Sequence, residues 1–228
     1  MDQGKDCREG RAMKGAPSVI VHGLGRSGTS LAMQMLAAGG WPVVGTFPDY
    51  EVDHLNAHRH GARTSRAGRI PIPADHLGRA MKLLWPAAWP WGEGAAVAIL
   101  ATRDPMAQAE SQVKLMRAAL PPGFPIDASK RKLRQLAEAN AEDTARARSL
   151  IQRAGVPLLE WPFLAVLRDP WKMAVRLSSF LDEHTGQGLN AERAAGMVIP
   201  RPPRCLSGML EDLLIRKAEQ LRAAAQPL

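Results

Sequence analysis

The chain has 228 residues, of which 46% are hydrophobic and 23% charged, and these are values of an ordinary globular domain. The absence of an apolar run of about 18 residues argues against a membrane span, and the two cysteines, Cys7 and Cys205, form neither a disulfide framework nor a metal-binding spacing. The formal net charge of +8 suggests an anionic partner: a nucleotide, a sulfated or phosphorylated acceptor, nucleic acid or a membrane surface. A basic surface without a specific partner is the alternative.

The first residues have mixed charge and no apolar stretch, which is not the pattern of a signal peptide. We therefore expect residues 1–16 to be a disordered leader and residues 17–228 to form one domain of a cytoplasmic protein. The oligomeric state cannot be predicted from the sequence.

The predicted elements alternate between strands and helices. We expect strands at 18–22, 41–45, 95–102 and 156–161. The segment 78–85 fits a strand or a helix, and the turn-rich residues that follow it favour a strand. We expect helices at 29–38, 105–119, 128–153, 170–181 and 208–225. Asp104 and Asp169 each precede a proline, the pattern of a helix N-cap, while 46–70 is polar and expected to be mostly loop. This alternation predicts an α/β fold: one domain with a mostly parallel sheet flanked by helices.

The segment VIVHGLGRSGTSLAMQML has a strand, a glycine-rich turn and a helix in the order of a phosphate-binding loop. Gly23, Gly28 and Ser30 match the Walker A pattern G-x-x-x-x-G-K-[ST], but Thr29 stands in the lysine position. A threonine cannot reach the β- and γ-phosphates as that lysine does. Arg26 supplies a basic residue at the tip of the loop, and its planar guanidinium suits the leaving oxygen of a transferred group.

The residues GRSGTS, at 25–30, resemble the 5′-phosphosulfate loop of the sulfotransferases that use 3′-phosphoadenosine-5′-phosphosulfate (PAPS). Bacterial and tyrosyl-protein members commonly have P-R-S-G-T-[ST] there, so a glycine replaces the usual proline. The resemblance implies a P-loop NTPase-like architecture in which loop amides bind the 5′-phosphate, helped by the dipole of the following helix. The cofactor-binding residues that it implies in this loop are Gly25, Arg26, Ser27, Gly28, Thr29 and Ser30.

The same family binds the 3′-phosphate with an arginine at the end of a later strand and a serine eight residues further on. Arg103 and Ser111 have this spacing in AVAILATRDPMAQAESQVKL. Such a pair would lie near the crevice in which open α/β sheets bind their ligands. Arg168 repeats the RDP tripeptide, but the eighth residue after it is Arg176, so only the first copy has the full pattern.

The resemblance extends more loosely over residues 18–206. GMVIPRPPRCL resembles a late basic loop of bacterial members, so Arg201 and Arg204 are candidate contacts of the 3′-phosphate, with solvated loop arginines as the alternative. Leu31 stands where the family often has an aromatic residue that stacks on adenine. Base stacking must therefore come from elsewhere or be absent.

The resemblance implies transfer of a sulfuryl group from PAPS to a hydroxyl or amine by in-line displacement, with 3′,5′-ADP (PAP) as the second product. Arg26 would stabilise the bridging oxygen, and no metal is expected.

A general base is expected in 46–58, because the family places a glutamate or histidine soon after the 5′ loop and the second strand. The candidates are Asp49, Glu51, Asp53, His54 and His58. Glu51 ranks first because it lies twenty-five residues after Arg26, within the range used by members with a glutamate base. His54 ranks second because an imidazole titrates near neutral pH, and a solvated loop carboxylate is the alternative for Glu51.

The acceptor is expected to bind the segment 46–94. The sequence does not identify the acceptor: a small molecule, a carbohydrate and a peptide all fit. Trp85, Trp89 and Trp91 either form a wall of the acceptor site or pack under a turn. The segment also contains an arginine cluster, namely Arg59, Arg63, Arg66, Arg69 and Arg79.

Two other function classes compete with the sulfotransferase. One is a P-loop kinase or NTPase, which needs a loop lysine and a Walker B aspartate. This chain lacks that lysine, and its nearest candidate for the aspartate, Asp104, is already explained as a helix cap. The other class is a nucleotide-binding protein without transfer activity, or a nucleic-acid binder driven by charge. It ranks last because the basic residues lack the interleaved aromatics of single-strand binders, and we expect no nucleic-acid partner.

Overall fold

The computed structural model describes residues 18–51, 74–84, 96–121 and 124–198. Predictions for the leader at 1–16, the candidate bases Asp53, His54 and His58, and the helix at 208–225 lie outside these residues. So do the predictions for Trp85, Trp89, Trp91, Arg201 and Arg204.

A four-stranded parallel sheet in the order β2-β1-β3-β4 forms the centre of the described part. Its strands are β1 (Ser18–His22), β2 (Ala80–Leu83), β3 (Ala96–Thr102) and β4 (Leu158–Pro162). β1 is buried along its whole length, as expected of a parallel strand that is covered on both faces. The predicted α/β class and parallel sheet are confirmed.

The predicted strand at 41–45 is wrong. This segment makes a single parallel bridge, from Val43 to Ala80, next to β2. Pro42 accepts a hydrogen bond from the Ala80 amide (2.8 Å) through its carbonyl, but a proline has no N–H to extend a ladder. Gly45, with φ of 84°, then turns the chain away.

Six α-helices and one 3-10 helix accompany the sheet in the described residues. They are α1 (Thr29–Ala38), η2 (Ala74–His76), α3 (Pro105–Ala119), α4 (Lys130–Arg153), α5 (Phe163–Arg168), α6 (Pro170–Thr185) and α7 (Ala191–Gly196). The predicted bounds of α1 and α3 are confirmed. α6 runs further than predicted, to the left-handed Gly186, and the sequence pattern predicts neither α5 nor α7. No helix in the described ranges is both long and apolar enough to cross a bilayer.

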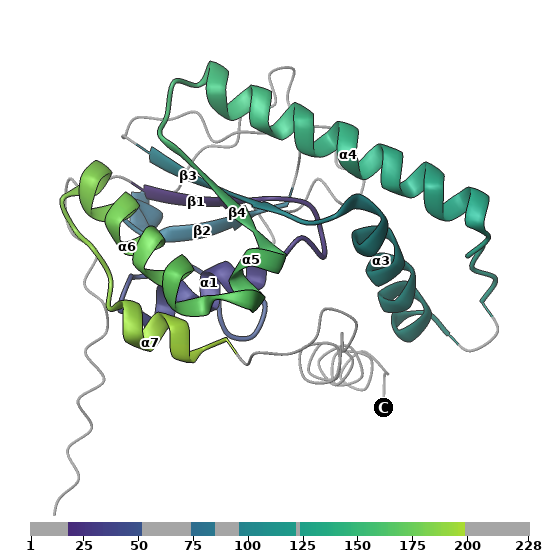
Figure 1. Ribbon diagram of the computed structural model, residues 1–228, viewed down its shortest axis with the longest axis horizontal. Coiled ribbons are helices and arrows are strands. Elements are labelled where there is room, and N and C mark those ends of the chain that lie inside the picture. Colours follow the sequence, from purple (N-terminus) through teal and green to yellow (C-terminus); the bar gives the residue numbers. More distant parts are fainter. Residues whose placement is uncertain (1–17, 52–73, 85–95, 122–123, 199–228) are drawn as a thin grey trace, which may run out of the picture.

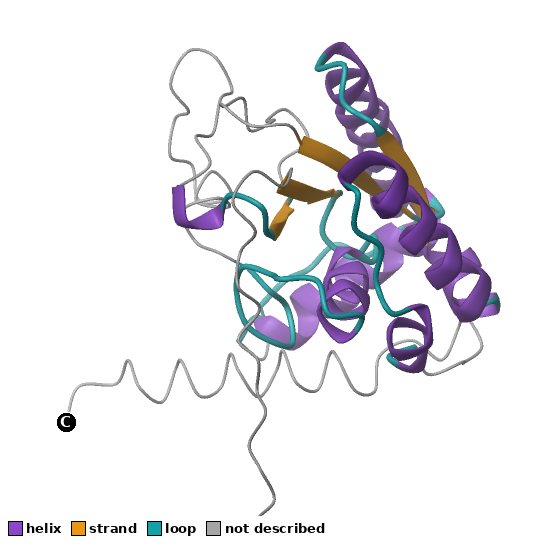
Figure 2. Ribbon diagram, turned by 90° about the vertical axis from the view of Figure 1, so that its left-hand side faces the viewer, coloured by secondary structure: helices purple, strands orange, loops and turns teal. Residues whose placement is uncertain are grey.

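The helices lie in two layers, one on each face of the sheet (Figures 1 and 2). Successive strand residues point to opposite faces, so Val19 and Val21 pack in a core with α1, α5, α6 and α7. Ile20 lies in the opposite core, which the C-terminal half of α4 covers through Ala147 and Ile151. In Figure 1, α4 continues past the sheet and packs there on α3.

The strand order creates a switch point between β1 and β3. The chain leaves β1 through α1 to reach β2 on one side, and β3 pairs with β1 on the other. Open α/β sheets bind ligands outside the carboxyl ends of the strands at such a point. The glycine-rich loop at residues 23–28 follows β1 and Arg103 follows β3, so both lie at the switch point.

Candidate functional site

The glycine-rich loop has two residues in the left-handed region of backbone space. Arg26 has φ of 71° and Gly28 has φ of 105°. The Ser27 amide donates to the Leu24 carbonyl at 3.1 Å, and this bond closes the turn. A non-glycine residue with positive φ is uncommon and is typical of sites where the surroundings impose the conformation.

The loop ends at the N-terminus of α1, where Gly28 is the N-cap and no side chain caps the helix. The first amides of an uncapped helix are available to an anion, and the helix dipole favours negative charge there. Ser27 is 2% exposed, and its hydroxyl has no hydrogen-bond partner among the described residues. This end of α1 can therefore donate several hydrogen bonds to a phosphate.

The two predicted phosphate signatures meet in the structure. Arg26 Nε donates to Ser111 Oγ at 2.9 Å, from a position 85 residues away in the sequence. Arg103 donates through Nη1 to the Arg26 carbonyl at 3.2 Å. Arg26, Arg103 and Ser111 therefore form one cluster at the switch point, and two of its three members are cations.

Two glutamines of α3 hold the loop from the side, and the sequence analysis does not identify them. Gln108 and Gln112 both donate to the Gly25 carbonyl, at 3.0 and 3.1 Å. Gln112 is itself bonded to Asn140 of α4, at 3.0 and 3.3 Å. The spacing of four residues, which places both amides on one face of a helix, is the only signal for them in the sequence.

Phe163 is a second residue that the sequence analysis does not identify. Arg103 Cζ lies 5.0 Å from the centroid of its ring, a cation–π distance. A Cβ atom added to Gly28 would lie 2.7 Å from Phe163 Cδ2, so the ring packs directly on the loop. Phe163 follows β4, whose carboxyl end lies beside that of β3, and this topology is the signal that could have found it.

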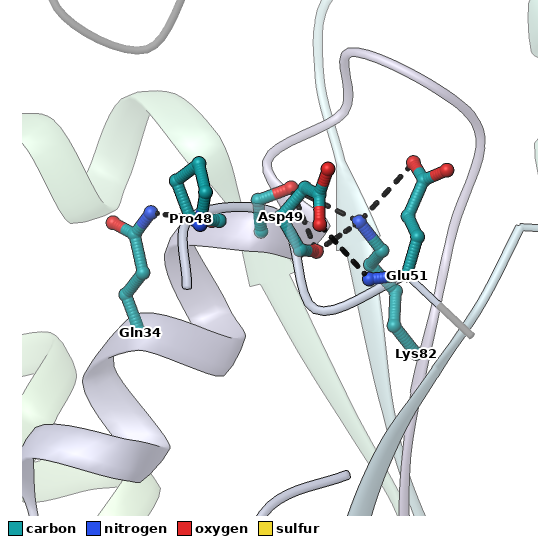
Figure 3. A network of polar contacts seen from close by, with 6 residues as sticks. Gln34, Pro48, Asp49, Glu51 and Lys82 are labelled. Carbon is teal, nitrogen blue, oxygen red and sulfur yellow. Dashed lines mark hydrogen bonds and ion pairs between the residues drawn. The ribbon is translucent and has the colours of Figure 1, made fainter. Parts of the chain in front are cut away.

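Lys82 is the third such residue, and it joins the first turn of α1 to the candidate base. Figure 3 shows its contacts with Asp49 and Glu51. It lies on β2, and its side chain is only 1% exposed. Its Nζ donates to Ser30 Oγ (3.2 Å), to Glu51 Oε1 (3.3 Å) and to the Asp49 carbonyl. A lysine in an otherwise apolar strand is the sequence signal, because lysine is almost never fully buried without partners.

The short segment that contains Glu51 is anchored at two further points (Figure 3). Gln34 of α1 donates to the Pro48 carbonyl at 2.8 Å, and the Glu51 amide donates to Asp49 Oδ1 at 3.2 Å. The Glu51 side chain is 36% exposed, so its carboxylate reaches solvent while it contacts Lys82. Of the predicted bases, Asp49 and Glu51 are thus brought beside α1.

The structure also places three other residues that the sequence singles out: Arg168, Arg79 and Asp104. Arg168, the control copy of the RDP pattern, lies exposed at the last residue of α5. Arg79 is the described member of the arginine cluster and donates to the Val43 carbonyl at 2.7 Å, which makes it a structural contact. Asp104 accepts from the Ala107 amide at 2.8 Å and caps α3, as predicted. Within the described ranges, no three His, Cys, Asp or Glu side chains are grouped as metal ligands.

No protein-family model matches this chain, and no curated protein matches it either. The support for a function therefore comes from the geometry of the site together with the two sequence motifs.

We predict that Gly28→Ala destabilises the protein more than Gly186→Ala, a matched glycine. Both have positive φ, which costs an alanine about 1–2 kcal/mol. Only at Gly28 does the new Cβ also meet a ring, and such overpacking adds roughly 1–3 kcal/mol; around Gly186 the space is open. Urea unfolding measures both losses. Equal losses would mean that Phe163 does not pack tightly on the loop.

Proposed function

We propose that this chain is a PAPS-dependent sulfotransferase with a P-loop NTPase-like architecture. The observation that carries the proposal is the hydrogen bond of 2.9 Å from Arg26 Nε to Ser111 Oγ. The resemblance of two separate motifs to the PAPS-dependent family implies that Arg26 binds the 5′-phosphosulfate and Ser111 the 3′-phosphate. A nucleotide that carries both groups on one ribose would contact both motifs at once.

The loop fits the phosphosulfate end of such a donor. The uncapped amides of α1 and the buried hydroxyl of Ser27 offer hydrogen bonds to phosphate oxygens. Arg103 provides a second guanidinium beside Arg26, whose backbone carbonyl it contacts. Arginine forks suit phosphate geometry, and bonds between charged partners are stronger than neutral ones.

The same loop is a poor match to a triphosphatase. Thr29 takes the place of the Walker lysine and is 3% exposed. Asp104, the nearest candidate for a Walker B aspartate, uses its carboxylate to cap α3. These two residues argue against a nucleoside triphosphate as the ligand.

The proposed reaction forms one bond to sulfur and breaks another. The hydroxyl or amine of the acceptor bonds to sulfur, and the bond between sulfur and the 5′-phosphate oxygen breaks. The electron pair stays on that oxygen, where Arg26 stabilises the charge. Glu51 takes the acceptor proton. A small molecule, a carbohydrate or a peptide could supply the acceptor group.

We predict that the protein binds 3′,5′-ADP in the micromolar range and ATP much more weakly, with no requirement for Mg²⁺. The two phosphate signatures each need one phosphate of 3′,5′-ADP. Titration calorimetry with 3′,5′-ADP, and with ATP in the presence and absence of Mg²⁺, measures the affinities. Tighter binding of ATP with Mg²⁺ than of 3′,5′-ADP would reject the sulfotransferase.

We predict that Arg103→Ala weakens binding of 3′,5′-ADP by roughly 1.5–3 kcal/mol, the scale of a hydrogen bond to a charged group. Arg168→Ala is the matched control: it removes the arginine of the second RDP tripeptide and should leave the affinity unchanged. The same calorimetric titration compares both variants with the natural chain. If both lose the same affinity, the wrong RDP copy has been assigned to the nucleotide.

We predict that Glu51→Gln lowers the transfer rate about 10²–10⁴-fold, the usual contribution of a general base. The affinity for 3′,5′-ADP should change only by a small factor, because the base acts on the acceptor and not on the nucleotide. The rate is measured by mass spectrometry with PAPS and an acceptor from a compound screen. A Glu51→Gln protein with normal turnover, beside an inactive His54→Ala protein, would move the role to His54.

A further inference from the structure

We propose that Lys82 is a positioning residue for sulfuryl transfer, whose buried ammonium group ties the phosphate-binding helix to the candidate base. This inference rests on the proposed function and adds to it a residue that neither signature contains. The decisive juxtaposition is that Lys82 Nζ lies 3.2 Å from Ser30 Oγ and 3.3 Å from Glu51 Oε1.

The burial of Lys82 calls for a reason. It pairs with Val21 of β1 and has Met81 and Leu83, both buried, as its neighbours on β2. An ammonium group in such a position is costly unless it is paired and hydrogen-bonded. An apolar residue of similar length would complete the strand without that cost. The lysine is therefore best explained by the groups that its Nζ holds.

The contacts of Lys82 show that it does not take the role of the missing Walker lysine, which would be to bind phosphate directly. An ammonium group has three N–H donors. Lys82 has an acceptor for each one: the Ser30 hydroxyl, the Asp49 carbonyl and the Glu51 carboxylate. A lysine that bound phosphate directly would have to give up one of these contacts. Lys82 therefore acts through Ser30 and Glu51 rather than on the nucleotide.

The contact with Ser30 sets the direction of that hydroxyl. Ser30 Oγ accepts from Lys82, so its own hydrogen is left to donate, and in this structure it points to the Asp49 carbonyl at 3.5 Å. A bond of 3.5 Å is long for a hydroxyl donor and weak. A phosphate bound at the N-terminus of α1 would take this hydrogen at little cost. Lys82 thus keeps Ser30 ready as a donor.

The contact with Glu51 fixes the position of the candidate base. Lys82 holds the segment at the Asp49 backbone and again at the Glu51 carboxylate, as Figure 3 shows. The Glu51 side chain is 36% exposed, and its contact with Lys82 restricts the positions that its carboxylate can take. A general base must lie within hydrogen-bond reach of the proton that it takes, and a displacement of about 1 Å can cost roughly 10²-fold in rate.

The test uses PAPS with water as the acceptor, so that no other acceptor is needed. Water bonds to sulfur, the bond from sulfur to the 5′-phosphate oxygen breaks with its electron pair on the phosphate, and Glu51 takes a proton. The release of sulfate and 3′,5′-ADP then gives kcat, and KM for PAPS. The variants are Lys82→Met, which keeps the length of the side chain without its charge, Lys82→Arg, and each of these with Glu51→Gln.

We expect Lys82→Met to lower kcat about 10²-fold while KM for PAPS stays within about threefold. Lys82→Arg should recover part of the rate, because it keeps a cation between Ser30 and Glu51. In a protein that already carries Glu51→Gln, Lys82→Met should lower kcat less than about threefold, because Lys82 acts by positioning a base that is no longer present. Lys114→Met removes an exposed lysine of α3 and should change nothing.

Several outcomes overturn this role. They are a higher KM with unchanged kcat, equal losses with and without Glu51→Gln, and no rescue by arginine. If Lys82→Met does not fold, Lys82→Gln replaces it, since glutamine can still donate to the Asp49 carbonyl. Failure of the proposed function looks different: the natural chain would neither consume PAPS nor bind 3′,5′-ADP. That result would reject sulfuryl transfer and, with it, the role of Lys82.

Discussion

The parallel pairing of β1 with β2 on one side and β3 on the other is the constraint on which the candidate site depends. In this register His22 lies opposite Leu83 and Leu100, so β1 and β2 end together and β3 continues past them to Thr102. The glycine-rich loop can then meet Arg103 and Ser111, which lie far away in the sequence. β4 adds Phe163 at the same edge. A shift in any pairing would move one of these groups away from the loop.

Side chains that donate to backbone carbonyls fix the conformation of the glycine-rich loop, which the strand pairing has placed beside α3. Gln108 and Gln112 both bind the Gly25 carbonyl, and Arg103 binds the carbonyl of the next residue. These bonds restrain the loop where Arg26 holds a positive φ. A loop restrained in this way is preorganised, which matters when catalysis depends on the position of donors rather than on their number.

Most elements of the fold can be predicted from the sequence, because they depend on local patterns; α5 and α7 are the helices that these patterns miss. Gly28, followed by a helix, and Asp104, followed by Pro105, are such patterns. The strand at 41–45 fails because Pro42 and Gly45 interrupt an apolar run that otherwise has β character. Lys82 is missed because its role arises only when β2 meets α1 and residues 49–51. Its partners are mostly backbone or hydroxyl oxygens, and these leave no pattern in a sequence.

Phe163 bears on the question of what stacks on a nucleotide base, since Leu31 takes the position of the expected aromatic. Its ring already has two neighbours: the Arg103 guanidinium, 5.0 Å from its centroid, and the Cα side of Gly28. A ring used in this way orients the arginine and supports the loop. It would have to give up the cation–π contact to stack on adenine over the same face. Phe163 is therefore better explained as a support for Arg103 and the glycine-rich loop than as a platform for a base.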